Sequence, residues 1–297
     1  MKEKIRSALM KYGAVAVGFA KAGLVDAEVT SSFEKWIEEG CHGEMEYLRR
    51  HIPLRKTTES VLPGAKTVVC MAFDYTPKEW ITGISAYAYG EDYHNQIRER
   101  LKGALSDFKS EFGGKWRLCI DSAPISERYW AMRSGIGRRG LNGALILEGC
   151  GPFCFLAELL TTIEITPDSP SIQWCEKCGN CLRICPGEAL KGDGTMDARK
   201  CINYLTIEKK EEFTPEEKEL LRKEGGSFFG CDRCFTVCPH RTLEGKEEIL
   251  PEIKNLTPDV IPEMDETTFV KKFKRTPLHY AGYNRLLRNA LALQKGK

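Results

Sequence analysis

The chain has 297 residues, of which 42% are hydrophobic and 29% are charged, and its formal net charge at pH 7 is +2. This balance is typical of a globular protein with one large or two medium domains, and it excludes a chain that is basic throughout. The charged start Lys2–Lys4 is followed by no apolar leader, and no apolar run approaches the ~18 residues of a membrane span. We therefore expect a cytoplasmic protein without a membrane segment.

The first 170 residues alternate helical and strand patterns. Ile5 and Leu9 lie on one face of an opening helix, and the apolar run 14–20 predicts a strand. Ser31 and Glu34 form a capping box that predicts the start of the next helix. Further elements are predicted in chain order: a buried strand at 67–73, a long helix at 92–112, and strands at 116–120, 144–147 and 153–160. This alternation indicates an α/β or α+β architecture and leaves the strand order open.

The composition changes at Pro167–Pro170, and from there to Pro239 the chain is rich in cysteine and poor in apolar runs. Such a segment depends on metal centres more than on a hydrophobic core. Short helical pieces follow, and residues 270–297 contain eight Lys or Arg and no Asp or Glu. This basic segment either binds phosphates or is a solubilising tail. We expect three parts: a catalytic domain at 1–168, a cysteine-rich domain at 169–242 and a helical basic segment at 243–297.

Thirteen cysteines are many for a reducing compartment, where a tight group of cysteines indicates metal ligation. The first run has the bacterial ferredoxin spacing C-x2-C-x2-C-x3-C-P and consists of Cys175, Cys178, Cys181 and Cys185. The second run, C-x2-C-x3-C-P, lacks one ligand and consists of Cys231, Cys234 and Cys238. Cys201, between the runs, can supply the missing ligand.

Eight cysteines complete two 4Fe–4S clusters if the last cysteine of each run ligates the other cluster. One cluster takes Cys175, Cys178, Cys181 and Cys238, and the other takes Cys231, Cys234, Cys201 and Cys185. Two structural zinc sites are the alternative, and the C-P endings favour clusters. We expect Cys70 and Cys119, which lie in strand-like runs, to be core residues, and Cys150 and Cys154 to be packing residues as well.

The amino-terminal part must hold the redox partner of these clusters, yet it has neither a Rossmann glycine motif nor a Walker sequence. Asp92 and His94 begin a corrinoid D-x-H-x-x-G motif, but Ile97 occupies the glycine position.

Several motifs together resemble the epoxyqueuosine reductase family, in order and over nearly the whole chain. They are GEMEY (43–47), LPGA (62–65), YAYGEDYH (87–94), DSAPISER (121–128) with the glycine-rich 135–140, DARKCINYLTIE (197–208), FGCDRCFTVCP (229–239) and LLRNA (286–290). The resemblance implies an amino-terminal cobalamin-binding reductase domain of α/β type, a ferredoxin-like domain with two clusters and a short helical tail, within an α+β fold.

The resemblance further implies reduction of the epoxide of epoxyqueuosine, in the anticodon stem-loop of tRNA, to the alkene of queuosine. Asp121 matches the family's general acid. The implied cofactor contacts are Arg55, Tyr87, His94, Asp121, Asn142 and Thr206. An external electron donor of the flavodoxin or ferredoxin type and a monomeric state are expected. The chain departs from many members at Gly137–Leu141 and lacks their carboxy-terminal helical repeats, so it resembles the short form.

Asp121 follows the apolar run 118–120, so burial against an apolar cofactor is expected to raise its pKa and make it an acid near neutral pH. The alternative is a helix N-cap before the segment 125–134. His94 either lines the cofactor pocket or simply occupies the first turn of the long helix. Arg138 and Arg139 either contact phosphates or are solvated.

Two other functions remain open from the sequence. A related corrinoid reductase could act on a small molecule, as reductive dehalogenases do, or the chain could be a non-catalytic electron carrier. Bound corrinoid and activity on tRNA are the observations that separate these alternatives.

Overall fold

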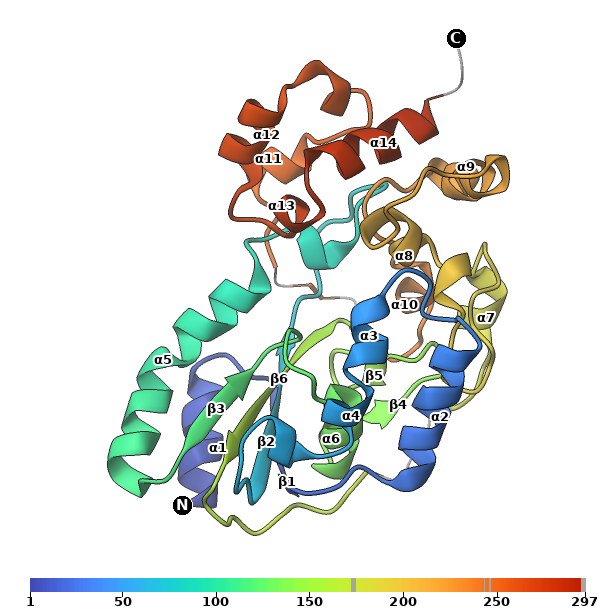
Figure 1. The fold of residues 1–297 in the computed structure, drawn as a ribbon. Helices are drawn as coiled ribbons and strands as arrows, with labels where there is room; N and C mark the ends of the chain where they lie inside the picture. Colours follow the sequence, from blue (N-terminus) through green and yellow to red (C-terminus); the bar gives the residue numbers. More distant parts are fainter. Residues whose placement is uncertain (172–174, 243, 246, 295–297) are drawn as a thin grey trace.

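The computed structural model describes residues 1–171, 175–242, 244–245 and 247–294. A four-stranded sheet of order β1-β2-β6-β3 forms the centre of the amino-terminal part, and each of its three pairings is antiparallel (Figure 1). Its strands are β1 (Ala16–Lys21), β2 (Thr67–Asp74), β3 (Trp116–Cys119) and β6 (Cys154–Thr161), and a separate ribbon consists of β4 (Arg138–Arg139) and β5 (Leu145–Ile146). The predicted α+β fold is confirmed.

Two helices, α1 (Lys2–Lys11) and α5 (Tyr93–Phe112), cover one face of the sheet (Figure 1). Their apolar stripes pack against alternate strand residues such as Met71 and Leu159. Asp92 caps α5, because its carboxylate accepts hydrogen bonds from the backbone N–H groups of His94 and Asn95. The long helix therefore begins where the sequence predicts, and its cap places His94 in the first turn.

Helix α6 (Glu127–Arg133) packs on the opposite face, over β1, β2 and β6. Its Trp130 is buried with Cys70 and Cys119, which are core residues as predicted. On this side lie also α2 (Ala27–Glu38), α3 (Glu46–Arg50) and α4 (Ile52–Arg55) (Figure 1).

The predicted capping box at Ser31 is wrong. Helix α2 begins at Ala27, after Asp26, and Ser31 lies inside it. There the Ser31 hydroxyl donates to the carbonyl of Ala27 at 2.8 Å, the bond that a serine makes in a helix interior.

The cysteine-rich part and the carboxy-terminal part are helical. Their helices are α7 (Asn180–Ile184), α8 (Ile202–Ile207), α9 (Pro215–Arg222), α10 (Arg233–Thr236), α11 (Pro251–Lys254), α12 (Glu266–Phe273), α13 (Pro277–Ala281) and α14 (Tyr283–Leu293). The carboxy-terminal helices share one hydrophobic core with Tyr89 and Phe229, and they contribute Phe269 and Leu286 to it. The basic segment is thus a packed helical unit rather than a loose tail.

Hydrogen bonds join residues of the predicted domains 1–168 and 169–242. The division of the chain into three domains stays a prediction. The N–H of Ala198 donates to the carbonyl of Cys41 at 2.8 Å, and Ile84 forms a β-bridge with Phe229. In the part of the chain that the structure describes, no helix is long and apolar enough to cross a membrane.

Candidate active site and cysteine groups

Asp121 lies in the loop between β3 and α6 and has a backbone φ of 53°. This left-handed conformation is uncommon outside glycine, and strained residues of this kind concentrate at functional sites. The helix that follows begins only at Glu127, with Ser126 as its N-cap. Asp121 is therefore not a helix cap, and that alternative is excluded.

Tyr93 holds the side chain of Asp121 through a hydrogen bond. Its hydroxyl donates to Oδ2 of Asp121 at 2.8 Å. The Tyr93 ring stands in an aromatic column between His94 and Phe155, with ring centroids 4.1 and 4.2 Å away, and Tyr75 stacks on Phe155 at 4.3 Å. Because the column spans α5, β6 and the end of β2, the sheet fixes the position of the phenol. The sequence analysis did not single out Tyr93, although the motif YAYGEDYH contains it.

His94 faces a carboxylate on each side of its ring. Its Nδ1 lies 3.0 Å from Oδ1 of Asp92, and its Nε2 lies 3.6 Å from Oδ2 of Asp121. Burial by itself lowers the pKa of His94, but the hydrogen bond to Asp121 and the charge of Asp92 outweigh it, and the pKa is raised. His94 occupies the first turn of α5, as one alternative predicted, and it also faces Asp121; its contact with a cofactor stays a prediction.

The expected rise in the pKa of Asp121 is wrong. The hydrogen bond with His94 lowers this pKa, burial opposes the shift, and the hydrogen bond from Tyr93 adds to it. The side chain is 62% exposed, so water screens part of the effect. Both pKa shifts favour an ion pair in which His94 carries the proton and Asp121 is ionised.

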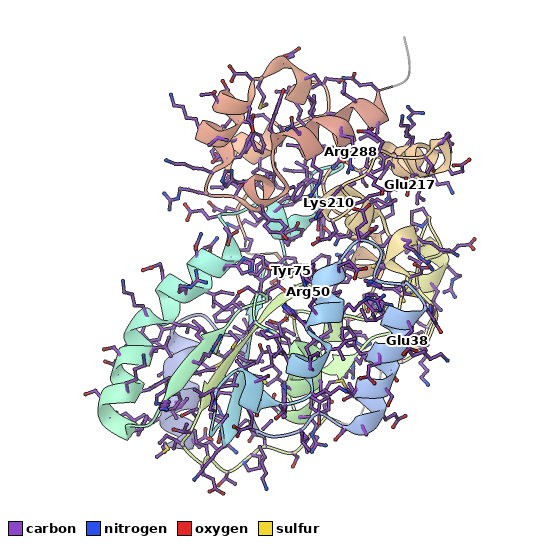
Figure 2. All side chains as sticks on the ribbon, viewed as in Figure 1. Glu38, Arg50, Tyr75, Lys210, Glu217 and Arg288 are labelled. Atoms are coloured by element: carbon purple, nitrogen blue, oxygen red, sulfur yellow. The ribbon has the colours of Figure 1, made fainter. Side chains whose placement is uncertain are left out.

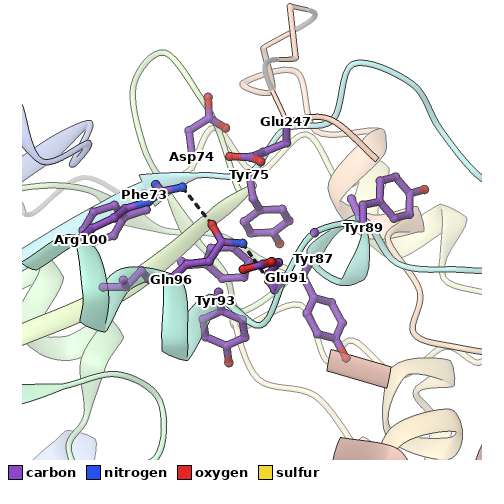
Figure 3. Close-up of a pocket in the computed structure, with 14 residues that line it drawn as sticks. Phe73, Asp74, Tyr75, Tyr87, Tyr89, Glu91, Tyr93, Gln96, Arg100 and Glu247 are labelled. Carbon is purple, nitrogen blue, oxygen red and sulfur yellow. Dashed lines mark hydrogen bonds between the residues drawn. The ribbon is translucent and has the colours of Figure 1, made fainter. Parts of the chain in front are cut away.

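Among the predicted cofactor contacts besides His94, Tyr87 and Arg55 feel the charge of Asp121. Tyr87 and Tyr93 line a cavity of about 30 Å³ together with Gln96, which accepts a hydrogen bond from Arg100 at 2.9 Å (Figure 3). This volume holds about one water molecule and not a large cofactor. Among the described residues, Nε of Arg55 is buried without a hydrogen-bond partner.

Thr206 and Asn142 serve as scaffold in the structure. Thr206 has no exposed surface, and its hydroxyl donates to the carbonyl of Ile202 and accepts from the N–H of Gly230. Asn142 is 7% exposed and donates from Nδ2 to the carbonyl of Cys234 at 3.3 Å. Asn142 therefore links the ribbon of β4 and β5 to the cysteine-rich part.

Two tyrosines that are open to solvent, Tyr47 and Tyr280, share the electrostatic surroundings of Asp121. Partial burial raises the pKa of Tyr280, and the charges of Glu208 and Asp121 raise it further. Burial also raises the pKa of Tyr47, and the charges of Glu208, Tyr280 and Asp121 raise it further. Tyr47 is 38% exposed and Tyr280 is 71% exposed. Side chains from α3, the end of α8, α13 and the Asp121 loop thus act on one another electrostatically, and the two tyrosines among them are open to solvent.

Electrostatic interactions among the eight predicted ligands follow the two predicted groups. Burial raises the pKa of the Cys238 thiol, and the charges of Cys178 and Cys175 raise it further. The charges of Cys175 and Cys178 also raise the pKa of Cys181. The first predicted group is Cys175, Cys178, Cys181 and Cys238, and its ligation of one cluster stays a prediction.

The second predicted group shows the same pattern. Burial raises the pKa of the Cys234 thiol, and the charges of Cys201, Cys231 and Cys185 raise it further. Among the described residues, no three His, Cys, Asp or Glu side chains converge on one point as the ligands of a single ion would. A cubane cluster has no need of such a point, because each of its cysteines binds a different iron.

Arg138 and Arg139 contact the cysteine-rich part. Nη2 of Arg138 lies 3.0 Å from Nδ1 of His240, and Nη2 of Arg139 donates to the carbonyl of Gly194 at 2.8 Å. Both arginines thus help to join the two parts of the chain, and solvation alone does not describe them.

Two arginines of the basic segment, Arg285 and Arg288, bind backbone carbonyls of the protein itself. Arg285 donates to the carbonyl of Ile207, and Arg288 donates to those of Leu205 and Lys209 at 3.1 and 3.0 Å. Within residues 270–294, three exposed lysines can meet a polyanion: Lys271, Lys272 and Lys274.

Residues 174–241 match a family model described as a 4Fe-4S double cluster binding domain. With the two cysteine groups and the tethered aspartate, this match defines the chain as an iron–sulfur oxidoreductase with two 4Fe–4S sites.

Residues 55–122 match a second family model, described as epoxyqueuosine reductase QueG, DUF1730. An epoxyqueuosine reductase from Cyclobacterium marinum is 36% identical over 95% of this chain and 94% of its own length. That of Escherichia coli is 34% identical over 96% of this chain and 79% of its own. The chain belongs to the epoxyqueuosine reductase family.

Solved structures agree with this assignment. The epoxyqueuosine reductase from Streptococcus thermophilus superposes with a TM-score of 0.87 at 27% identity, covering 99% of this chain and 80% of its own. An epoxyqueuosine reductase crystallised with an epoxyqueuosine-modified stem loop of tyrosine tRNA gives 0.88 at 28% identity over 98% of this chain and 80% of its own. The enzyme from Bacillus subtilis, with a TM-score of 0.87 at 27% identity over 98% of this chain and 80% of its own, is described with a catalytic aspartate loop swung out of its active site.

Proposed function

We propose that this protein reduces the epoxide of epoxyqueuosine in tRNA to the alkene of queuosine, with cobalamin and with electrons relayed by two 4Fe–4S clusters. The observation that carries the proposal is the strained, exposed Asp121, which accepts a hydrogen bond from Tyr93 and faces His94. Family membership and the relative crystallised with a modified tRNA stem loop support the substrate.

The two cysteine groups are the proposed cluster ligands. Cys178 is exposed, whereas Cys238 of the same group is buried. Backbone N–H groups point at ligand sulfurs in both groups: that of Leu141 lies 3.4 Å from Sγ of Cys175, and that of Ala189 lies 3.3 Å from Sγ of Cys185. Such bonds stabilise thiolates and tune cluster potentials. The exposure of Cys178 favours electron entry at the first cluster from an external flavodoxin or ferredoxin.

The side chains around Asp121 suit cobalamin, which is not part of the structure. Exposed tyrosine rings suit the edge of a flat macrocycle, and the unpartnered Nε of Arg55 offers a donor to its polar side chains. Tyr47, Tyr280 and Arg55 would hold the cofactor there, with Tyr87 and His94 lining the side toward the sheet. When bound, cobalamin would supply the reducing centre between the clusters and the epoxide.

The residues of this chain supply and position the proton. As the C–O bond of an epoxide breaks, its oxygen gains negative charge and must be protonated to leave. Asp121 is exposed to solvent and is bonded to the Tyr93 hydroxyl and to a histidine with a raised pKa. A proton passed from His94 to Asp121 would make it the acid, while the aromatic column holds the Tyr93 phenol in place.

The test is turnover of epoxyqueuosine-containing tRNA by protein that is purified without oxygen and supplied with cobalamin and a reductant. The Asp121→Asn variant keeps the shape of the side chain but has no proton to give, and Asp107→Asn on the exposed side of α5 is the matched control. We expect wild type and Asp107→Asn to form queuosine and Asp121→Asn to bind tRNA without turnover. Absence of queuosine in all three, with both clusters and cobalamin bound, would contradict the proposed function.

A further inference from the structure

A carboxylate outside the proposed chemistry holds the Asp121 loop. Oε1 of Glu127, the first residue of α6, accepts a hydrogen bond from the backbone N–H of Asp121 at 2.8 Å. The left-handed backbone of Asp121 is unfavourable for a residue with a Cβ, so the loop needs such a bond to keep this shape. A charged acceptor makes a stronger bond to an N–H group than a neutral one. The charge of Glu127 therefore bears directly on the position of Asp121.

A second carboxyl, Glu158, lies behind Glu127. In the sheet register one row runs across all four strands, from Gly18 through Cys70 and Glu158 to Cys119. Paired residues point to the same face, and for this row it is the face where Trp130 of α6 packs with the two cysteines. Glu127 lies three residues before Trp130 and four before Ala131, so the three share one side of α6.

Glu158 has no exposed surface, and neither of its carboxylate oxygens has a hydrogen-bond partner among the described residues. An ionised carboxylate is not stable in such a place, whereas a protonated one is tolerated. Two close carboxyls in a water-poor site share one proton for the same reason.

We propose that Glu127, in its ionised form, is the positioning residue that holds Asp121 in the active site, and that Glu158 stays protonated behind it. The buried pair then carries one negative charge, placed on the side where it anchors the loop. The catalytic consequence of this arrangement rests on the proposed role of Asp121. The positioning itself rests on the hydrogen bond from Asp121 to Glu127 and on the burial of Glu158.

The electrostatics of both carboxyls agree with this arrangement. Burial raises the pKa of Glu158 well above its usual value; the charges of Glu127 and Asp121 raise it further, and Arg55 opposes. Burial and then the charge of Asp121 raise the pKa of Glu127 to about 7, against its bond to the Asp121 N–H and the charges of Arg128 and Arg55. The thiols of Cys70 and Cys119, the other titratable groups beside Glu158, are themselves buried with raised pKa values. Glu127 therefore gains its proton as the pH falls through neutrality, and its hold on Asp121 weakens there.

Hydrogen exchange tests the hold without reference to activity. The variants are Glu127→Gln, Glu158→Gln and, as a matched control, Glu164→Gln, which replaces an exposed glutamate beyond the end of β6. Amide exchange of the Asp121 loop is followed by mass spectrometry from pH 6 to 9 in holoprotein, with intrinsic rates corrected. We expect protection in wild type and in Glu164→Gln that weakens toward pH 6, and about tenfold faster exchange in Glu127→Gln at pH 8.

Glu158→Gln places a neutral side chain where the proposal has a neutral acid. It should keep wild-type protection at pH 8 and lose the infrared carbonyl band of a protonated carboxyl that wild type shows at that pH. If Glu127→Gln exchanged like the control, or if wild type showed no such band, the proposal would be overturned.

Turnover adds the catalytic consequence. Glu127→Gln should lower kcat about tenfold at pH 8 with KM for tRNA unchanged, whereas a purely structural role would lower cluster content as well. Wild-type protein that is inactive on epoxyqueuosine-tRNA but shows the exchange and infrared results would refute the proposed function and leave the positioning role standing.

Discussion

Arg288 on α14 fastens the carboxy-terminal helices to the segment that follows Cys201. Its guanidinium donates to the carbonyls of Leu205 and Lys209 at 3.1 and 3.0 Å, and it lies 4.0 Å from the centroid of the Phe213 ring. Figure 2 shows Arg288 on the side of α14 that faces Lys210 and Glu217. An Arg288→Ala substitution removes these contacts together and leaves the carbonyls without their donor.

The size of the loss follows from the contacts. A hydrogen bond from a charged donor contributes roughly 1.5–3 kcal/mol, and a cation–π contact contributes roughly 0.5–2 kcal/mol. Because these terms are not additive and Arg288 is only partly buried, we expect a loss of about 3 kcal/mol. For a protein of this size that corresponds to a fall in Tm of about 5–10 °C.

Arg275→Ala is the matched control in the same segment. Arg275 makes an ion pair with Glu91 at 2.7 Å, but its side chain is 71% exposed, so the pair contributes about 0.5 kcal/mol or less. Thermal unfolding of the oxygen-free holoproteins, followed by circular dichroism, compares the two variants. A Tm of Arg288→Ala within 1–2 °C (about 0.5 kcal/mol) of the Arg275→Ala value would refute the reasoning.

Four further outcomes are expected. Asp121→Asn should retain cobalamin, clusters and tRNA binding but lose turnover by about 10²-fold or more, and turnover within a few-fold of wild type would remove Asp121 from the mechanism. Cys201→Ala should lower the iron content from about eight to about four atoms per chain, and retention of both clusters would disprove the crossed ligation. Charge reversal at Lys271 and Lys272 should weaken tRNA binding and flatten its dependence on salt, and an unchanged slope would make the lysines merely solubilising. Folded Glu158 keeps a proton that the unfolded chain releases above the usual pKa of 4.5, so the stability of wild type should fall with rising pH more than that of Glu158→Gln. Parallel curves of Tm against pH from pH 6 to 9 for the two proteins would show that Glu158 is ionised.

Local chemistry made much of this protein predictable. The long helix starts at Asp92 because a side-chain cap and the apolar stripe that follows it act within a few turns. The cysteine spacing likewise indicated two clusters, since each run has the ferredoxin spacing in which the last cysteine ligates the other cluster. The resemblance drew attention to Asp121 through the residues around it, and the structure places that residue in a strained loop.

Other features depended on which segments meet. No periodicity in the chain reveals that Cys70 and Cys119 flank Glu158, because sheet register joins strands that are far apart in sequence. The pKa of Asp121 was predicted to rise from its apolar neighbours in the chain, yet His94, which folding brings beside it, lowers the pKa instead.

The sequence by itself indicated most strand and helix segments of the amino-terminal part, the eight candidate cluster ligands and the basic character of the carboxy-terminal end. The tertiary structure alone decided the antiparallel order of the sheet, the hydrogen bonds of Arg285 and Arg288 to backbone carbonyls, and the burial of Glu158 without a hydrogen-bond partner among the described residues. The physical reason is range: propensity, capping and ligand spacing act over a few residues, whereas desolvation and charge interactions depend on groups that only folding brings together.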